Sequence, residues 1–149
     1  MQQLHFSIAI NAPKEKVWQT LWDKNTYSDW ANAIDPGHDI ENDYHDFKIG
    51  TKVRFLHPSG TGTAGIIEEY RPDELITYKT IADLKDGIEQ PIDQSGAWAG
   101  SKETFTLTEA NDMTTVTTTF GVPVAHKEAF EASYPRALQR LKELAERKA

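Results

Sequence analysis

The chain has 149 residues, a formal net charge of -7 and no cysteine. Its acidity argues against broad binding to nucleic acid or anionic membranes, because both need a basic surface. The lack of cysteine excludes disulfides, thiol nucleophiles and cysteine–zinc sites. Its first residues lack the features of a signal peptide, so we expect none. It contains no apolar run of about 18–20 residues that could cross a bilayer. We therefore expect a cytoplasmic protein with no integral membrane segment and one domain over residues 1–149.

The first predicted strand is LHFSIAIN, residues 4–11, in which apolar and polar side chains alternate. This alternation is typical of a half-buried strand. A helix is predicted over the following NAPKEKVWQTLW, with Asn11 as its N-cap and Pro13 in its first turn. A second short helix is predicted over DKNTYSDW, with Tyr27 and Trp30 turned inward.

Six further strands are predicted, separated by turn sequences such as PSG, RPDE and EANDM. Their ranges are 40–44, 52–57, 62–70, 75–82, 102–109 and 114–122. From Val124 to Arg147 the apolar side chains recur at helical spacing, which predicts one long helix. Successive antiparallel strands with helices on one face indicate an α+β fold. Such helices leave a pocket against a curved sheet, and ligands often bind in such pockets.

Three segments resemble the SRPBCC (START-like) helix-grip superfamily: INAPKEKVWQTLWDKNTYSDW, GIIEEYRPDELITYKT and ETFTLTEANDMTTVTTTF. The chain looks most similar to the branch related to the activator of heat-shock-protein ATPase and to polyketide cyclase/dehydrase proteins. The resemblance implies a curved antiparallel sheet of about seven strands, two short helices and one long C-terminal helix over an internal cavity. It implies no single reaction, because the superfamily ranges from carriers to enzymes.

Three of the four tryptophans, Trp18, Trp22 and Trp30, lie within thirteen residues. Aromatic side chains at helical spacing usually pack into a core, where each buries about 150–250 Å². We therefore expect core packing for these rings, with Trp30 the one that faces the cavity. Trp98 lies among small residues in SGAWAGS and is an additional candidate for the cavity wall.

Aromatic side chains expected around the cavity are the predicted ligand-binding residues: Trp30, Phe55, Tyr78, Trp98, Phe130 and Tyr134. Polar side chains on apolar strand faces are the candidate catalytic residues, namely His57, Glu103 and Tyr78. A carboxyl group in an apolar pocket has a raised pKa and can serve as a general acid or base. A histidine can do the same near neutral pH. The alternative for each is a strand end or an orienting hydrogen bond.

The motif GTGTAG, residues 60–65, has the letters of a dinucleotide-binding loop. Such a loop must open a helix, whereas strands are predicted after this one, so we expect a hairpin turn. The five histidines lack metal-binding spacing. His38 and His45 lie in an acidic stretch that we expect to be solvated surface. No metal and no cofactor are predicted.

Three functions stay open. The first is binding of a small hydrophobic, aromatic or lipid-like molecule in the cavity, with His57 or Glu103 orienting a polar group. The second is a polyketide cyclase or dehydratase type of enzyme that uses an acid/base residue in the same cavity. The third is an interaction with a chaperone ATPase, which is disfavoured because we expect only one domain. The C-terminal helix or a sheet edge could also support a homodimer.

Overall fold

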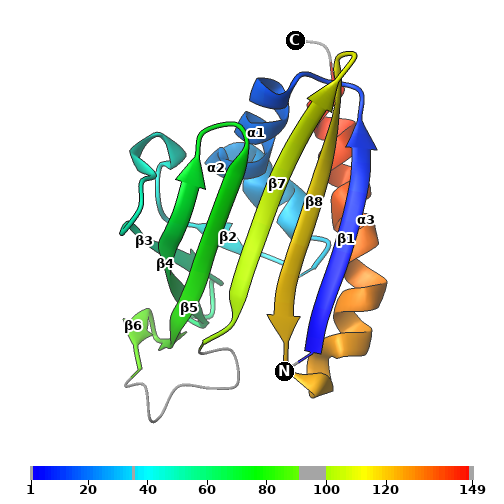
Figure 1. Ribbon diagram of the computed structural model, residues 1–149. Coiled ribbons are helices and arrows are strands. Elements are labelled where there is room, and N and C mark those ends of the chain that lie inside the picture. Colours follow the sequence, from blue (N-terminus) through cyan, green and yellow to red (C-terminus); the bar gives the residue numbers. More distant parts are fainter. Residues whose placement is uncertain (1, 35, 91–99, 148–149) are drawn as a thin grey trace.

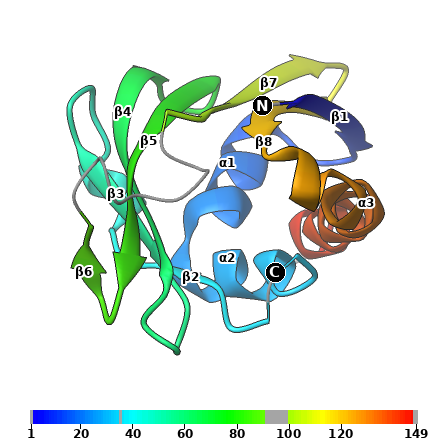
Figure 2. The same cartoon turned by 90° about the horizontal axis from the view of Figure 1, so that it is seen from below.

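A computed structural model of the protein describes residues 2–34, 36–90 and 100–147. Eight strands in these ranges form one antiparallel sheet, which curves around three α-helices (Figures 1 and 2). The strands are β1 (Gln2–Ile10), β2 (Asp39–Ile40), β3 (Lys52–Leu56), β4 (Gly62–Arg71), β5 (Leu75–Lys85), β6 (Ile88–Glu89), β7 (Lys102–Ala110) and β8 (Met113–Val122). The helices are α1 (Lys14–Trp22), α2 (Lys24–Ala31) and α3 (Lys127–Ala145), with 3-10 turns η1 (Tyr44–Asp46) and η3 (Val124–His126).

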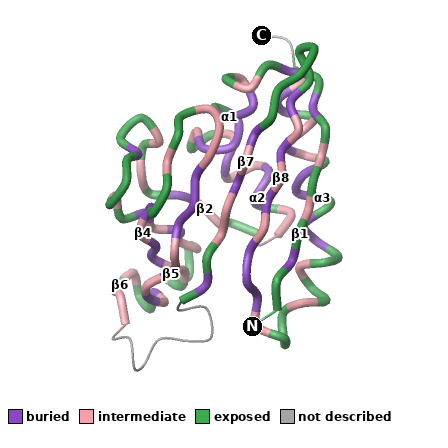
Figure 3. Tube along the Cα trace, in the orientation of Figure 1, coloured by how far each residue is buried: buried purple, intermediate pink, exposed green. Residues whose placement is uncertain are grey.

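The sheet order is β1-β8-β7-β5-β4-β3-β2, and β6 pairs with β5. The first strand in the chain therefore lies beside the last one. Buried and less buried positions alternate along β5 and β8 (Figure 3), as they do when one face of a sheet covers a core. The predicted α+β order of a strand, two short helices, successive strands and a long helix is confirmed.

The long helix α3 packs on the end of the sheet through one apolar face. Tyr134, Leu138, Leu141 and Ala145 are buried on this face. The rings of Tyr134 and Phe6 on β1 are stacked with their centroids 5.1 Å apart. Since these side chains recur three or four residues apart, one helix face is enough to cover β1 and its neighbour.

The short helices carry the tryptophans into the same core. Trp18 and Trp22 on α1 and Trp30 on α2 are each no more than 2% exposed. The Asp23 carboxylate accepts a hydrogen bond from the Asn25 backbone N–H at 3.0 Å and caps α2. The prediction of Asn11 as the cap of α1 is wrong, because Pro13 holds the N-cap position, and no side chain caps this helix.

The predicted strand over residues 40–44 is also wrong in its length. Only Asp39–Ile40 is a strand, and the chain then forms the 3-10 turn η1. The Asp43 carboxylate accepts a hydrogen bond from the His45 backbone N–H at 2.9 Å. Local side-chain hydrogen bonds of this kind compete with strand pairing, which explains why the strand stops.

The GTGTAG segment forms the predicted hairpin turn and leads into β4. The Gly60 backbone N–H donates to the His57 carbonyl oxygen at 2.9 Å. A Cβ atom at Gly62 would lie 2.0 Å from the Phe55 carbonyl oxygen, so glycine is required by this close approach. The motif therefore serves strand pairing.

One cluster of buried apolar residues connects the sheet with all three helices of the described ranges. A single domain over residues 1–149 agrees with this cluster and stays a prediction. None of the helices in these ranges is long and apolar enough to cross a membrane.

Candidate ligand-binding pocket

A pocket of about 450 Å³ lies between the sheet and the helices. Its size falls in the range of small-molecule sites, which is about 300–1,000 Å³. Within the described residues, nine aromatic side chains line it: Trp22, Tyr27, Trp30, Phe55, Tyr78, Phe105, Phe120, Phe130 and Tyr134. They come from all three helices, α1, α2 and α3, and from strands on both halves of the sheet. The pocket is therefore an aromatic chamber assembled by the tertiary fold.

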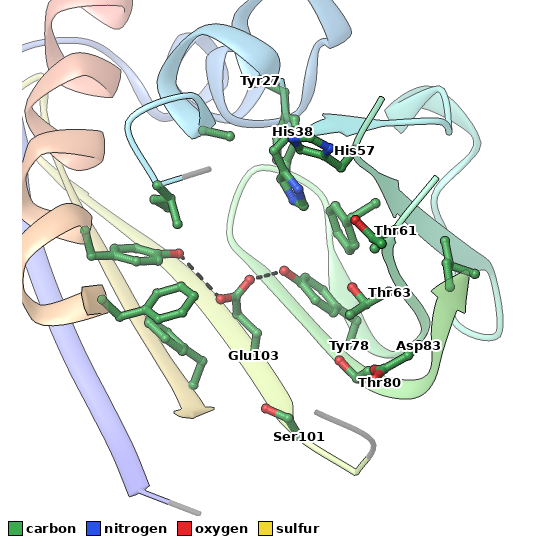
Figure 4. Close-up of a pocket in the computed structure, with 18 of the residues that line it drawn as sticks. Tyr27, His38, His57, Thr61, Thr63, Tyr78, Thr80, Asp83, Ser101 and Glu103 are labelled. Atoms are coloured by element: carbon green, nitrogen blue, oxygen red, sulfur yellow. Dashed lines mark hydrogen bonds between the residues drawn. The ribbon is translucent and has the colours of Figure 1, made fainter. Parts of the chain in front are cut away.

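Glu103 on β7 is the carboxyl group at the centre of this chamber (Figure 4). The Tyr78 hydroxyl on β5 donates a hydrogen bond to Glu103 Oε1. The Tyr134 hydroxyl on α3 lies 3.4 Å from Glu103 Oε2 and donates a longer hydrogen bond. Two elements far apart in the sequence thus hold the carboxyl group from two sides.

Burial raises the pKa of Glu103 from its ordinary value of 4.5 to about 7. The surrounding aromatic rings replace water, which disfavours the charged form. The hydrogen bonds from Tyr78 and Tyr134 act in the opposite direction and lower the pKa, because they stabilise the carboxylate. The removal of water is the larger effect. Glu103 can therefore gain or lose a proton near neutral pH.

Burial also raises the pKa values of Tyr78 and Tyr134 well above 10, and the negative charge of Glu103 adds to this effect. Both hydroxyl groups therefore keep their protons at neutral pH and act as hydrogen-bond donors. Tyr27 on α2 behaves similarly, with burial as the main cause and the charges of Glu103 and Asp39 as smaller ones.

Several polar side chains also line the pocket. They are Thr63 on β4, Thr80 and Asp83 on β5, Ser101 before β7 and His57 after β3 (Figure 4). The Ser101 hydroxyl donates to the Gly121 carbonyl oxygen at 2.7 Å. The His57 Nδ1 atom lies 2.8 Å from the Ser59 hydroxyl oxygen.

The pocket brings together most side chains that the sequence singled out. Trp30, Phe55, Tyr78, Phe130 and Tyr134 line it, as do the candidate catalytic residues His57 and Glu103. Trp98 lies outside the described residues. Tyr78 and Glu103 contact one another, whereas no hydrogen bond recorded in the structure joins His57 to Glu103 within the described ranges. Their roles in binding or catalysis stay predictions.

Among the aromatic and histidine residues that line the pocket, sequence reasoning missed five, namely Trp22, Tyr27, His38, Phe105 and Phe120. Trp22 was expected in the core, and it is both buried and part of the wall. His38 was placed on a solvated acidic surface. That prediction is wrong for His38, because its imidazole stacks on the Phe55 ring with centroids 5.9 Å apart. The neighbouring aspartates led to this error, because an acidic stretch is usually exposed to solvent.

The described residues contain no group of three or more histidine, aspartate or glutamate side chains that could hold a metal ion. The family described as Activator of Hsp90 ATPase homolog 1-like protein matches residues 11–146. The chain belongs to this family. The resemblance to the SRPBCC superfamily is thereby confirmed. No curated protein matches the chain.

Solved structures with low sequence identity share the helix-grip fold. CV1439 from Chromobacterium violaceum is 22% identical, with a TM-score of 0.70 over 99% of this chain and 100% of that one. The Aha1 dimer from Colwellia psychrerythraea is 19% identical, with a TM-score of 0.71 over 98% and 97% of the two chains. DynU16, from the dynemicin biosynthetic locus, is 15% identical, with a TM-score of 0.68 over 96% of this chain and 46% of that one.

Proposed function

We propose that this family member binds a small, largely aromatic molecule in the pocket and holds a polar group of that molecule with Glu103. The observation that carries the proposal is a carboxyl group inside an aromatic chamber of about 450 Å³. Apolar walls with a few well-placed polar groups are the usual composition of a small-molecule site. The aromatic walls would supply affinity and Glu103 would supply orientation.

The hydrogen bonds to Glu103 leave room for a ligand. A carboxylate has about four acceptor positions on its two oxygens. Tyr78 and Tyr134 each donate to a different oxygen. The remaining positions can accept a hydrogen bond from a hydroxyl or amino group of the ligand. Because the tyrosines come from β5 and α3, they restrain the carboxyl group before the ligand arrives, which lowers the entropic cost of binding.

The experiment combines native mass spectrometry of the purified protein with calorimetric titration of 2-naphthol. We expect a co-purified small molecule or a saturating 1:1 titration. Thr63→Trp would fill the pocket from β4 and weaken 2-naphthol binding at least tenfold. Thr117→Trp on β8 is the matched control, because Thr117 does not line the pocket. Equal binding by wild type and Thr63→Trp would place the site elsewhere and overturn the proposal.

A second function, an enzyme of the polyketide cyclase or dehydratase type, is favoured by the proton affinity of Glu103. A general base works best with a pKa near the working pH, and Glu103 has a pKa of about 7. It would accept a proton from a carbon atom next to a ketone and return it to the product. A turnover that Glu103→Gln leaves unchanged would contradict this function.

The comparisons also bear on partners. One related structure is that of an Aha1 dimer. We propose that this chain can form a homodimer as well, which sedimentation equilibrium would test. An interaction with a chaperone ATPase stays the third alternative, because the observations on the pocket support a small molecule.

A further inference from the structure

Two acidic residues and two histidines line the pocket. They are Glu103, Asp83, His38 and His57. Within the described ranges, no lysine or arginine lines the pocket. Residues 91–99, which lie outside those ranges, contain neither residue type in their sequence. Among the described lining residues, Glu103 therefore has no lysine or arginine beside it.

Three basic side chains on the strands that border the pocket form ion pairs with acidic residues outside it. Arg54 on β3 pairs with Glu41 at 3.1 Å. On the same strand, Lys52 pairs with Glu89 at 3.0 Å. Lys102, which precedes Glu103 on β7, pairs with Glu68 at 3.0 Å. Since successive strand residues point to opposite faces, Lys102 lies on the other face from Glu103.

Aromatic rings stand on both sides of Glu103. The Phe55 and Tyr78 rings lie 5.2 Å apart on one side. The Phe120 and Tyr134 rings lie 4.8 Å apart, with Tyr134 also bonded to the carboxyl group. The faces of aromatic rings carry negative charge density and attract organic cations. A carboxylate among such rings is suited to an ammonium group, because buried charges are stable when paired.

We propose that the pocket selects an organic cation, a compact aromatic amine whose ammonium group pairs with Glu103 while its apolar part contacts the surrounding rings. This inference rests on the proposed function and specifies its ligand class. A fatty acid or another anion would bring a second negative charge beside Glu103 and would be rejected. Binding of the cation also favours ionised Glu103, whose pKa of about 7 leaves it partly protonated when the pocket is empty.

The test uses three probes of one shape and different charge. They are 2-naphthylmethylamine, 2-naphthylmethanol and 2-naphthoic acid, each titrated calorimetrically at pH 7.5. We expect the amine to bind at least tenfold more tightly than the alcohol and the acid to bind most weakly. Titration of the amine in phosphate and in Tris should also show release of a fraction of a proton, because Glu103 is partly protonated before binding. The release is detected because the two buffers differ in ionisation enthalpy. This second readout needs no variant.

Glu103→Gln should weaken amine binding at least tenfold and change alcohol binding less than threefold. Glu69→Gln is the matched control, because Glu69 is exposed on β4 and does not line the pocket. In wild type, amine affinity should fall as the pH drops from 8 to 6 and Glu103 gains its proton. Tyr78, Tyr134 and Tyr27 stay neutral in this range, because burial raises the pKa of each hydroxyl. The other ionisable side chains that line the pocket are Asp83, His38 and His57. The contribution of Glu103 is the part of the decrease that Glu103→Gln abolishes.

The outcomes separate the two proposals. If the alcohol binds in the pocket and the amine has no advantage, the ligand class is wrong and the binding function stands. The same holds if the acid binds as tightly as the amine, or if Glu103→Gln keeps the preference for the amine. If none of the three probes binds wild type, both proposals are overturned.

Discussion

Tyr78 and Glu103 stand directly opposite one another on the neighbouring strands β5 and β7, and the tyrosine hydroxyl donates to the carboxyl group. Their side chains share the concave face of the sheet and line the pocket (Figure 4). The pair therefore combines a titratable group with a donor that holds it. This arrangement makes the charge of Glu103 sensitive to pH and to small changes around it.

The raised pKa of Glu103 predicts a decrease in stability with rising pH. The folded state holds a proton on this group up to about pH 7, whereas the unfolded state releases it near 4.5. The stabilisation of the folded state by this bound proton is fully present below pH 4.5 and is lost as the pH rises through 7. Between pH 5 and pH 8 the free energy of unfolding should fall by up to about 2–3 kcal/mol from this group.

Urea denaturation of wild type and Glu103→Gln at pH 5 and pH 8 would measure this contribution. Glutamine does not titrate, so the difference between the two proteins should change with pH in the predicted direction. A difference that is the same at both pH values would show that the pKa of Glu103 is ordinary.

Tyr78→Phe keeps the ring and removes the donor to Glu103. Because that hydrogen bond lowers the pKa of Glu103, its loss should raise this pKa further. The variant should lose roughly 1.5–3 kcal/mol of stability at pH 8, where Glu103 is charged, and less at pH 5. Carbon-13 NMR of the glutamate carboxyl groups would follow the titration directly. Tyr44→Phe is the control, since Tyr44 lies in η1 outside the pocket, and an unchanged Glu103 titration in Tyr78→Phe would refute the prediction.

Arg140 on α3 joins the Asp29 carboxylate on α2 with two hydrogen bonds, of 2.7 and 3.0 Å. The pair connects two helices that both contribute residues to the pocket. A double-mutant cycle with Arg140→Gln and Asp29→Asn should give a small favourable coupling free energy, because both groups are partly solvated. The coupling should shrink in 1 M NaCl, where charges are screened. A coupling that salt does not change would mean that packing, rather than charge, joins the helices.

Gly62→Ala should destabilise the β3–β4 hairpin by about 3 kcal/mol, because the new Cβ atom would overlap the Phe55 carbonyl oxygen. Phe55 lines the pocket, so ligand binding should weaken too. Gly50→Ala is the comparison, since Gly50 has a φ of 92° and open space around it. It should lose only about 1 kcal/mol, from backbone strain alone. Thermal denaturation would rank the two variants, and equal losses would contradict a steric cause at Gly62.

The order of elements could be predicted because it depends on local patterns. The alternation of apolar and polar residues in β1 and the helical spacing of apolar residues in α3 each indicate which face of the element is buried. These patterns do not depend on which element packs against that face. Aromatic residues of the pocket, such as Phe55 and Tyr134, could be predicted for the same reason. The end of β2 could not, since several local hydrogen bonds within residues 43–47 outweighed a weak strand preference.

The sequence by itself determined the fold class, the acidic charge and the residue types available for a site. Only the tertiary structure decided which of them meet. Tyr78 and Glu103 are 25 residues apart, and their contact depends on strand register, which a shift of one residue would reverse. Tyr134 joins them because α3 packs across the sheet. The pKa of Glu103 follows from that assembly, since removal of water is a property of the surrounding fold and not of the residue.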